Sequence, residues 1–118
     1  MARDILMGID GGTGSIRVGL FDFEGHEITF DAVEYDTAHP YPGWAEQKPE
    51  DWWSALREAI HNAMDKAGVT SERILAMALD TTSCTVVAAK KDGTPLRDCI
   101  LWMDVRAAQE AKIVDESS

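Results

Sequence analysis

Alternating apolar and polar positions mark the first third of the chain. An apolar run covers residues 5–10, and from residue 16 to 23 apolar side chains alternate with residues such as Arg17. A third alternating segment, residues 28–32, follows the Glu24–Gly25 turn. Because alternation with a period of two is typical of strands, and short glycine-containing turns join antiparallel neighbours, we expect an antiparallel meander of three strands.

Helical spacing replaces this alternation after a loop at residues 37–48. From Trp53 to Ala67 apolar side chains recur every three or four residues, and Gly68 follows as a terminator. Pro49 suits the first turn of a helix, where a missing N–H costs nothing. The pattern therefore predicts a helix that begins near Pro49, with Trp53 in the core.

Apolar segments in the second half are shorter. Residues 74–79 form a continuous apolar run, as expected for a strand covered on both faces. Asp92–Gly93 predicts a hairpin, residues 99–102 a short strand, and residues 104–114 a helix. Strands and helices in this order favour an α/β fold, with a mixed sheet and flanking helices.

Composition and charge exclude several classes of function. The 118 residues make one domain or part of one, and the formal net charge of −10 would repel nucleic acid. No apolar run has the roughly 20 residues needed to span a bilayer, so we expect no membrane partner. The first residues lack the features of a signal peptide, which predicts a cytoplasmic protein. Cys84 and Cys99 lie in apolar sequence, so we expect two core thiols and no disulfide.

A glycine-rich segment, residues 10–15, follows the first predicted strand. Its glycines permit a tight turn and a close approach of the backbone to a ligand, and successive N–H groups there could hold a phosphate. Asp10 could hold the accompanying magnesium ion. A glycine-rich hairpin with a turn-capping aspartate would explain the same residues, so the segment alone leaves both interpretations open.

Two further polar segments could carry chemistry. Residues 80–85 follow the buried strand, where α/β sheets tend to place ligand contacts, although a turn bonded to its own backbone would look the same. Asp104 could be the N-cap of the last helix, which is the stronger interpretation in isolation. Trp102 could pack in the core or stack on a sugar ring, and the sequence does not decide between them.

The order of these segments resembles the FGGY family of carbohydrate kinases, within the superfamily of actin-like ATPases. Asp10-x-Gly-Thr-x-Ser-x-Arg17 is similar to the family's first phosphate motif. Residues 43–53, which include Trp-Ala-Glu-Gln-Lys-Pro, resemble its W-x-E-Q-x-P-x-x-W-W stretch, and residues 101–107 resemble its W-x-D-x-R segment. The three matches are modest singly, but their order and spacing cover nearly the whole chain.

The resemblance implies a ribonuclease-H-like domain and an ATP- and Mg²⁺-dependent kinase of a sugar or polyol. It assigns the metal to Asp10. It assigns phosphate binding to Gly12, Thr13, Gly14, Ser15 and Arg17. It assigns the substrate pocket to Thr81, Thr82, Ser83, Cys84 and Asp104. Glycerol kinases carry Arg-Glu and xylulokinases Met-His where this chain has Ser83-Cys84. The stretch Asp80-Thr-Thr-Ser83 looks more like the ribulokinase branch.

Members of the family are several times longer than this chain. The resemblance therefore implies that residues 1–118 are the N-terminal part of the N-terminal domain, with the general base and the C-terminal domain absent. An inactive fragment is expected, because lid closure completes such sites. The alternative is a non-catalytic module for protein association, and uncovered apolar surface leaves a homodimer open.

Overall fold

The computed structural model describes residues 2–117, and within them the chain divides into two compact units. The first unit comprises the chain up to Tyr35 together with Glu50–Thr82. The second comprises Asp36–Pro49 and the chain from Ser83 onward. No helix among the described residues is both long enough and apolar enough to cross a membrane.

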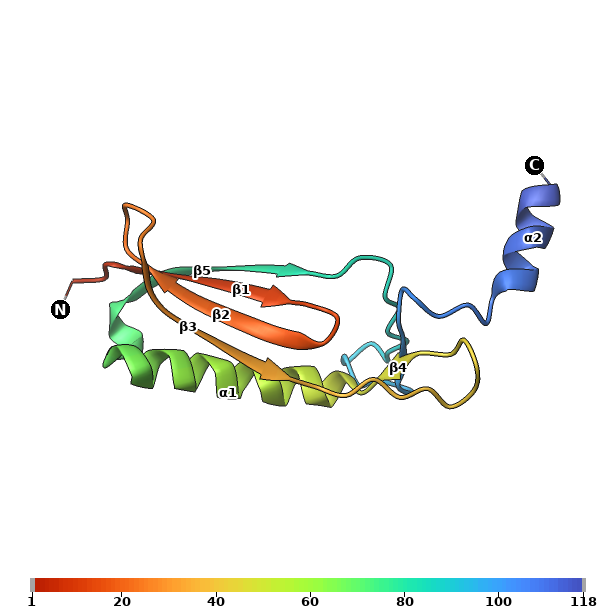
Figure 1. Cartoon of the computed structure of the whole chain (residues 1–118), viewed down its shortest axis with the longest axis horizontal. Helices are drawn as coiled ribbons and strands as arrows, with labels where there is room; N and C mark the ends of the chain where they lie inside the picture. The colour runs from red at the N-terminus through yellow and green to blue at the C-terminus, as the bar shows by residue number, and fades with distance from the viewer. Residues whose placement is uncertain (1, 118) are drawn as a thin grey trace. The chain divides into compact units, whose positions relative to one another are not determined.

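A four-stranded mixed sheet forms the first unit (Figure 1). Its strands are β1 (Ile5–Gly11), β2 (Ser15–Phe21), β3 (Glu27–Glu34) and β5 (Ile74–Thr81). β1, β2 and β3 pair antiparallel, which confirms the predicted meander, and β5 pairs parallel with β1 at the opposite edge from β3. A parallel pair needs a long crossover, which here contains helix α1 (Pro49–Ala67) and the 3₁₀ turn Ser71–Arg73.

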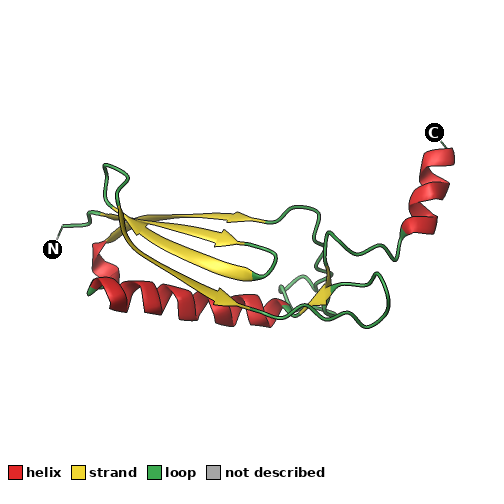
Figure 2. Ribbon diagram, viewed as in Figure 1, coloured by secondary structure: helices red, strands yellow, loops and turns green. Residues whose placement is uncertain are grey.

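Helix α1 begins at Pro49 as predicted and lies along one face of the sheet (Figure 2). Its buried stripe is made of Ala55, Ala59 and Ala63. These small side chains bring the helix axis close to the sheet, and Gly68, with φ of +63°, ends the helix in the left-handed conformation. The buried core of the unit also contains Ile5, Met7, Ile9, Ile16, Val18, Leu20 and Val69.

The prediction that Trp53 lies in the core was wrong. Its residue exposure is 66%, whereas Trp52 packs against the core. Helical spacing places position 53 at the rim of the apolar stripe, about 120° around the helix from Ala59 at 100° per residue. Because alanines occupy the centre of the stripe, the helix sits too close to the sheet for a rim indole to be enclosed.

Strand β3 turns its polar face toward the core. Asp31 is buried, while Ile28 and Phe30 on the other face are 43% and 47% exposed. The Asp31 carboxylate accepts hydrogen bonds from Lys66 and, at 3.0 Å, from Asn62, both on α1. The predicted alternation is therefore correct, but its apolar positions point away from the helix.

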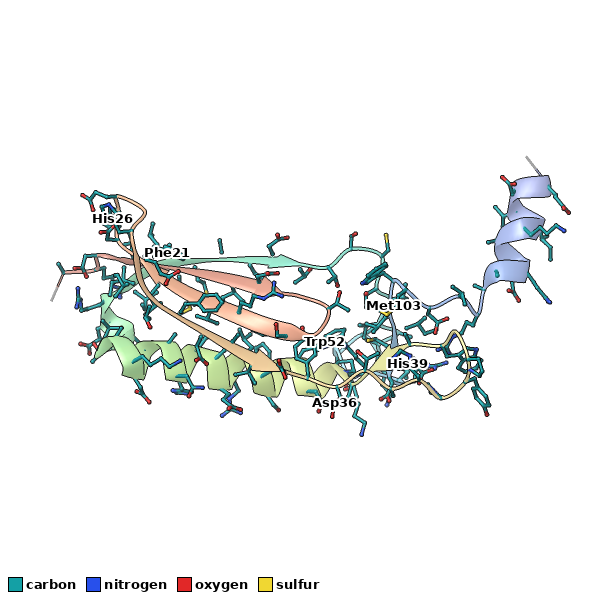
Figure 3. All side chains as sticks on the ribbon, viewed as in Figure 1. Phe21, His26, Asp36, His39, Trp52 and Met103 are labelled. Atoms are coloured by element: carbon teal, nitrogen blue, oxygen red, sulfur yellow. The ribbon has the colours of Figure 1, made fainter. Side chains whose placement is uncertain are left out.

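The face of the sheet opposite α1 is built from small residues near its centre. Gly8 and Gly19 are cross-strand partners there, and the Phe21 ring lies over them (Figure 3). A Cβ at Gly19 would come within 2.6 Å of that ring, so the glycine is required for Phe21 to lie flat on the strands.

Strand β5 is not covered on both faces, contrary to the prediction. It forms an edge of the sheet, and Leu75, Met77 and Leu79 are 49%, 63% and 64% exposed. The apolar run does form the expected strand. Among the described residues, the core between α1 and the sheet is contacted by Ile74 of β5 but includes none of these three side chains.

The second unit is built around a short antiparallel pair, β4 (Glu46–Gln47) with β6 (Cys99–Ile100). Part of the predicted loop at residues 37–48 is therefore a strand, and the predicted strand at 99–102 is shorter than expected. The hairpin at Asp92–Gly93 is confirmed: Gly93 has φ of +87°, and Ala89 bridges Pro95 across the turn.

Helix α2 (Ala108–Glu116) begins four residues later than predicted, and none of its residues is buried. Ala107 occupies the N-cap position, so Asp104 does not cap this helix. The carboxylate of Asp104 instead accepts hydrogen bonds from Arg106 and from the backbone of Ala45, a segment far away in sequence.

Only one of the two predicted core thiols is in the core. Cys99 is buried at 1% exposure, and burial raises the pKa of its thiol. Cys84 is exposed and adopts φ of +61° in the turn after β5. Both cysteines are free, as predicted.

The alanine stripe can be tested by overpacking. We expect Ala59→Leu to lower the free energy of unfolding by about 1–3 kcal/mol, because the added carbons have no room between α1 and the sheet. Glu58→Leu adds the same side chain at the neighbouring exposed position and should change stability by less than about 0.5 kcal/mol. Urea unfolding of both variants measures this, and equal effects would contradict the packing described.

The Asp31–Lys66 pair predicts a pH dependence. The Lys66 hydrogen bond, followed by that of Asn62, lowers the pKa of Asp31 below its usual value. A lowered folded-state pKa gives stability that is present above the unfolded pKa and lost as the pH falls through the folded one. Lys66→Met should therefore cost about 1 kcal/mol at pH 7, with Lys66 half exposed, and progressively less below about pH 4.

Urea unfolding between pH 7 and pH 3 measures this difference. Lys112→Met is the matched control, since the Lys112–Glu116 pair is 75% and 65% exposed and should contribute almost nothing at any pH. A Lys66→Met effect that stays constant down to pH 3 would contradict the role assigned to the ion pair.

Candidate active site

The loop between β1 and β2 is closed by Tyr35. The Gly12 N–H donates to the Ser15 carbonyl at 2.9 Å, and the Tyr35 N–H donates to the Gly14 carbonyl at 3.1 Å. The Tyr35 hydroxyl also donates to the Gly12 carbonyl. These bonds engage carbonyl oxygens of the loop in contacts with the protein, which holds the turn in one conformation.

Tyr35 was not identified from the sequence as part of this site. Burial, and then the negative charge of Asp10, raises the pKa of its phenol, so the hydroxyl remains protonated and can donate to Gly12 at neutral pH. The available signal was its position directly after β3, whose last residue, Glu34, pairs with Ser15. Only the pairing of β2 with β3 brings Tyr35 to the loop.

Asp10 and Arg17 are cross-strand partners beside this loop. Nη1 of Arg17 donates to Oδ2 of Asp10 at 2.6 Å, and each side chain is 47% exposed. An ion pair this exposed contributes about 0–1 kcal/mol to stability. The pair therefore adds little to the stability of the fold. The Asp10 carboxylate and the Arg17 guanidinium both remain accessible to a ligand.

The end of β5 lies next to the end of β1. Asp10 is the register partner of Asp80, and Gly11 is the partner of Thr81. The Thr82 N–H donates to the Gly11 carbonyl at 3.1 Å, and the Thr81 N–H donates to Oδ1 of Asp80 at 2.9 Å. The first unit thus brings the glycine-rich segment together with Thr81 and Thr82.

Asp80 places a second carboxylate beside Asp10 on the same face of the sheet. The sequence predicted a metal ligand at Asp10 alone. Both aspartates end apolar strands, which a parallel pairing aligns, and this signal was missed. Magnesium prefers carboxylate and water oxygens and is commonly bound through one or two carboxylates. Asp10 is partly exposed and Asp80 is exposed, so both carboxylates fit that requirement.

In the second unit, the segment after β5 meets β6 and the residues that follow it. Val86 bridges Ile100, and the Trp102 N–H donates to Oγ1 of Thr85 at 3.3 Å. The predicted substrate residues Ser83 and Cys84 directly precede Thr85 and are exposed. Two of the predicted segments therefore lie together in this unit. Trp102 is 54% exposed, so it does not lie in the core.

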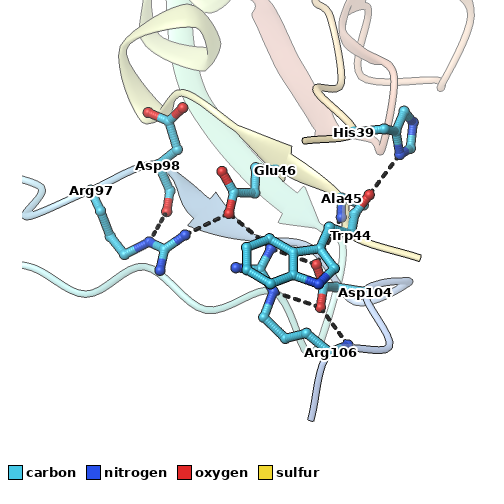
Figure 4. Close-up of polar contacts among 8 residues, drawn as sticks. All are labelled: His39, Trp44, Ala45, Glu46, Arg97, Asp98, Asp104 and Arg106. Carbon is cyan, nitrogen blue, oxygen red and sulfur yellow. Dashed lines mark hydrogen bonds and ion pairs between the residues drawn. The ribbon is translucent and has the colours of Figure 1, made fainter. Parts of the chain in front are cut away.

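Asp104 is bonded entirely by groups of this unit (Figure 4). Oδ2 accepts from the Ala45 N–H at 2.7 Å and from Nη2 of Arg106 at 2.6 Å, and Oδ1 accepts from Nε of Arg106 at 2.8 Å. Its side chain is 1% exposed, and the Arg106 hydrogen bonds hold its pKa well below the usual range. This geometry favours a positioning role, and the substrate contact assigned to Asp104 stays a prediction.

A protein-family model matches nearly the whole chain. Residues 5–118 match the model described as "FGGY family of carbohydrate kinases, N-terminal domain". The chain belongs to the FGGY family of carbohydrate kinases. The two strand ends with Asp10 and Asp80 and the segment around Asp104 all lie within the matched range.

The curated relatives that the chain matches include glycerol kinases. The chain is 35% identical over 102 residues to a glycerol kinase of Chloroflexus aurantiacus, covering 86% of this chain and 20% of that protein. It is 33% identical over 106 residues to glycerol kinase 2 of Streptomyces coelicolor, covering 89% of this chain and 21% of that protein. The chain thus spans about 20% of the length of the curated relatives it matches.

Solved structures of FGGY kinases share the fold. A xyloylose kinase from Brucella ovis superposes with a TM-score of 0.91 and 29% identity, over 96% of this chain and 24% of that one. A xylulose kinase from Rhodospirillum rubrum gives a TM-score of 0.90 and 24% identity, over 97% of this chain and 23% of that one. The mixed sheet with flanking helices is therefore part of the actin-like ATPase fold, as the resemblance implied.

The glycines of the loop differ in what the fold requires of them. A Cβ at Gly12 would lie 3.1 Å from the Ser15 carbonyl oxygen and 3.4 Å from the Arg17 guanidinium, whereas a Cβ at Gly14 would meet nothing within 4 Å. We expect Gly14→Ala to be neutral or stabilising, since alanine reduces the entropy of the unfolded chain. Gly12→Ala should be less stable than Gly14→Ala by about 1 kcal/mol, which urea unfolding measures. Equal stabilities would contradict the crowded loop.

Proposed function

We propose that this chain supplies the phosphate-binding side and part of the acceptor side of an ATP-dependent kinase that phosphorylates a hydroxyl of a sugar or polyol. This proposal rests on the groups that meet at the edge of the sheet where β1 and β5 end. A half-exposed Asp10–Arg17 pair, a closed glycine loop and a second carboxylate, Asp80, meet there.

The chemistry of phosphoryl transfer suits these groups. It requires positioning of the phosphates and neutralisation of their charge more than covalent participation of the protein. The backbone N–H groups of residues 13–15 would hold phosphate oxygens, and Arg17 would neutralise charge beside them. Asp10 and Asp80 would hold Mg²⁺, which supplies further charge neutralisation when bound. Tyr35 would keep the loop from relaxing, because it fixes two of its carbonyls.

The general base belongs, on this proposal, to a part of the enzyme outside these residues. A carboxylate that accepts the proton of the acceptor hydroxyl must lie within hydrogen-bond reach of it. Asp104 is a poor candidate because its oxygens already accept hydrogen bonds from Arg106 and Ala45. The matching relatives are about four times as long as this chain, which leaves ample chain for a base and a nucleotide lid.

We propose a pentulose such as ribulose as the first acceptor to test. The Ser83–Cys84 pair is uncharged and exposed, and the exposed indole of Trp102 could stack on the carbon face of a sugar. Glycerol is the second candidate, supported by the 35% identity to glycerol kinases.

A cytoplasmic location also stays a prediction.

A protein-association module remains the second candidate function. The observation that favours it is the exposure of β5 at the edge of the sheet. Leu75, Met77 and Leu79 form an apolar row there, beside the backbone groups that an edge strand leaves unpaired within the sheet. A module of this kind would form a homodimer or a complex in sedimentation experiments, and it would show no phosphoryl transfer with any acceptor.

The experiment is an ATP-dependent phosphorylation assay of the full-length enzyme with ribulose, ribitol, xylulose and glycerol. We expect turnover with at least one acceptor and a loss of at least about 100-fold in kcat for Asp10→Asn, which keeps the size of the side chain and removes its charge. Glu27→Gln makes the same change on the exposed carboxylate of β3, at the opposite strand ends, and should leave kcat unchanged.

Thermal unfolding of each variant separates catalysis from folding. Because the Asp10–Arg17 pair is half exposed, Asp10→Asn should keep nearly the stability of the wild type. If no acceptor is phosphorylated, or if Asp10→Asn is as active as Glu27→Gln, the proposed function is wrong.

A further inference from the structure

A tight turn at residues 101–104 displays two large side chains. The Asp104 N–H donates to the Leu101 carbonyl at 3.0 Å, which closes the turn around Trp102 and Met103. These two central residues are 54% and 36% exposed, whereas Leu101 is 4% exposed. The turn therefore presents an indole and a thioether at the surface of the second unit.

Both ends of this turn are fixed to the same residue. The Leu101 N–H donates to the Ala45 carbonyl at 3.0 Å, and the Ala45 N–H donates to Oδ2 of Asp104 at 2.7 Å. The next residue, Val105, donates its N–H to the Gly43 carbonyl at 2.9 Å. The position of Trp102 and Met103 thus depends on how firmly residues 43–45 hold the two ends.

Arg106 joins these two segments through three different contacts (Figure 4). Nε and Nη2 form a two-pronged contact with Asp104, and Nη2 lies 2.8 Å from Oε1 of Glu46. Its guanidinium carbon lies 3.7 Å from the centre of the Trp44 ring. One side chain therefore contacts Asp104 at the end of the turn and two residues that flank Ala45.

The contacts of Arg106 require its planar fork. A guanidinium can bond two carboxylates and stack on an indole at the same time, and an ammonium group of the same charge cannot reproduce that geometry. Side-chain exposures of 1% for Asp104, 11% for Glu46 and 15% for Arg106 place the network largely out of water. Largely buried ion pairs of this kind contribute little net stability, and their best-attested use is to specify one arrangement.

We propose that Arg106 is a positioning residue, which sets the geometry of the Trp102–Met103 turn as one wall of the acceptor subsite without touching the acceptor itself. This inference rests on the proposed kinase function. Arg106 acts through Asp104 and Ala45, since its guanidinium is already engaged by Asp104, Glu46 and Trp44. The Thr85 hydroxyl, one residue after Cys84, accepts the Trp102 N–H and connects the turn with the predicted substrate segment.

The kinetic test uses the full-length enzyme and the variant Arg106→Lys. Loss of the fork should raise the KM for the sugar or polyol by roughly tenfold or more, because small misplacements of a binding wall are costly, while the KM for ATP stays within about twofold. Arg97→Lys is the matched control: Arg97 also bonds Glu46, at 2.5 Å, but it is 49% exposed and does not contact Asp104. The control should leave both KM values unchanged.

A double-mutant cycle tests whether Arg106 acts through the turn. If it does, Arg106→Lys should change the acceptor KM of a Trp102→Ala enzyme by less than about twofold, because the side chain it positions is already gone. Additive effects of the two substitutions would contradict the inference. So would an equal loss of ATP and acceptor affinity in Arg106→Lys, which is the signature of general destabilisation.

A readout that does not need activity separates this inference from the proposed function. In the 118-residue chain, replacing Trp44, Trp52 and Trp53 by phenylalanine leaves Trp102 as the only one of its four tryptophans. A phenylalanine ring at position 44 still offers Arg106 an aromatic face to stack on. We expect Arg106→Lys to lower the fluorescence anisotropy of Trp102 and Arg97→Lys to leave it unchanged. Unchanged anisotropy in Arg106→Lys overturns the positioning role, whether or not the enzyme phosphorylates any acceptor.

If the anisotropy falls but the acceptor KM does not change, the turn is no part of the acceptor subsite and the inference is equally wrong. If the wild-type enzyme phosphorylates nothing, the proposed function fails, and the anisotropy alone then decides whether Arg106 orders the turn.

Discussion

The parallel pairing of β1 with β5 is the constraint on which the rest of the first unit depends. Hydrogen bonding in register aligns the two strands so that both end at the same edge, with Asp10 beside Asp80. The pairing also requires a crossover, and α1 fills it with an alanine stripe that lets the helix lie close to the strands. Without this pairing, the glycine loop would be an ordinary hairpin turn with one carboxylate next to it.

Charge is used differently in the two units. In the first, Asp10 and Arg17 are half exposed and contribute little to the fold, so their charges remain available to a ligand. In the second, Asp104, Glu46 and Arg106 are largely buried and satisfy one another. The first arrangement suits binding, whereas the second suits the fixing of backbone segments, because buried partners leave few alternative geometries.

The sequence predicted the local elements well where one physical pattern dominates. The meander, the start of α1 at Pro49 and the turn at Gly93 follow from alternation, the tolerance of proline in a first helical turn, and positive φ. The prediction of burial was wrong where neighbouring side chains decide how exposed a residue is. Trp53 has helical spacing yet is exposed, because the alanines beside it determine how near the sheet lies.

The amino-acid sequence by itself determined the family, the glycine-rich turn that follows the first strand, and the order of strands and helices. These depend on residues close together in the chain. Only the tertiary structure decided that Tyr35 closes the loop, that Asp80 stands beside Asp10, and that Asp104 is tied to Ala45 rather than capping a helix. Each of these contacts joins segments far apart in sequence, and their proximity arises from strand pairing that no local pattern encodes.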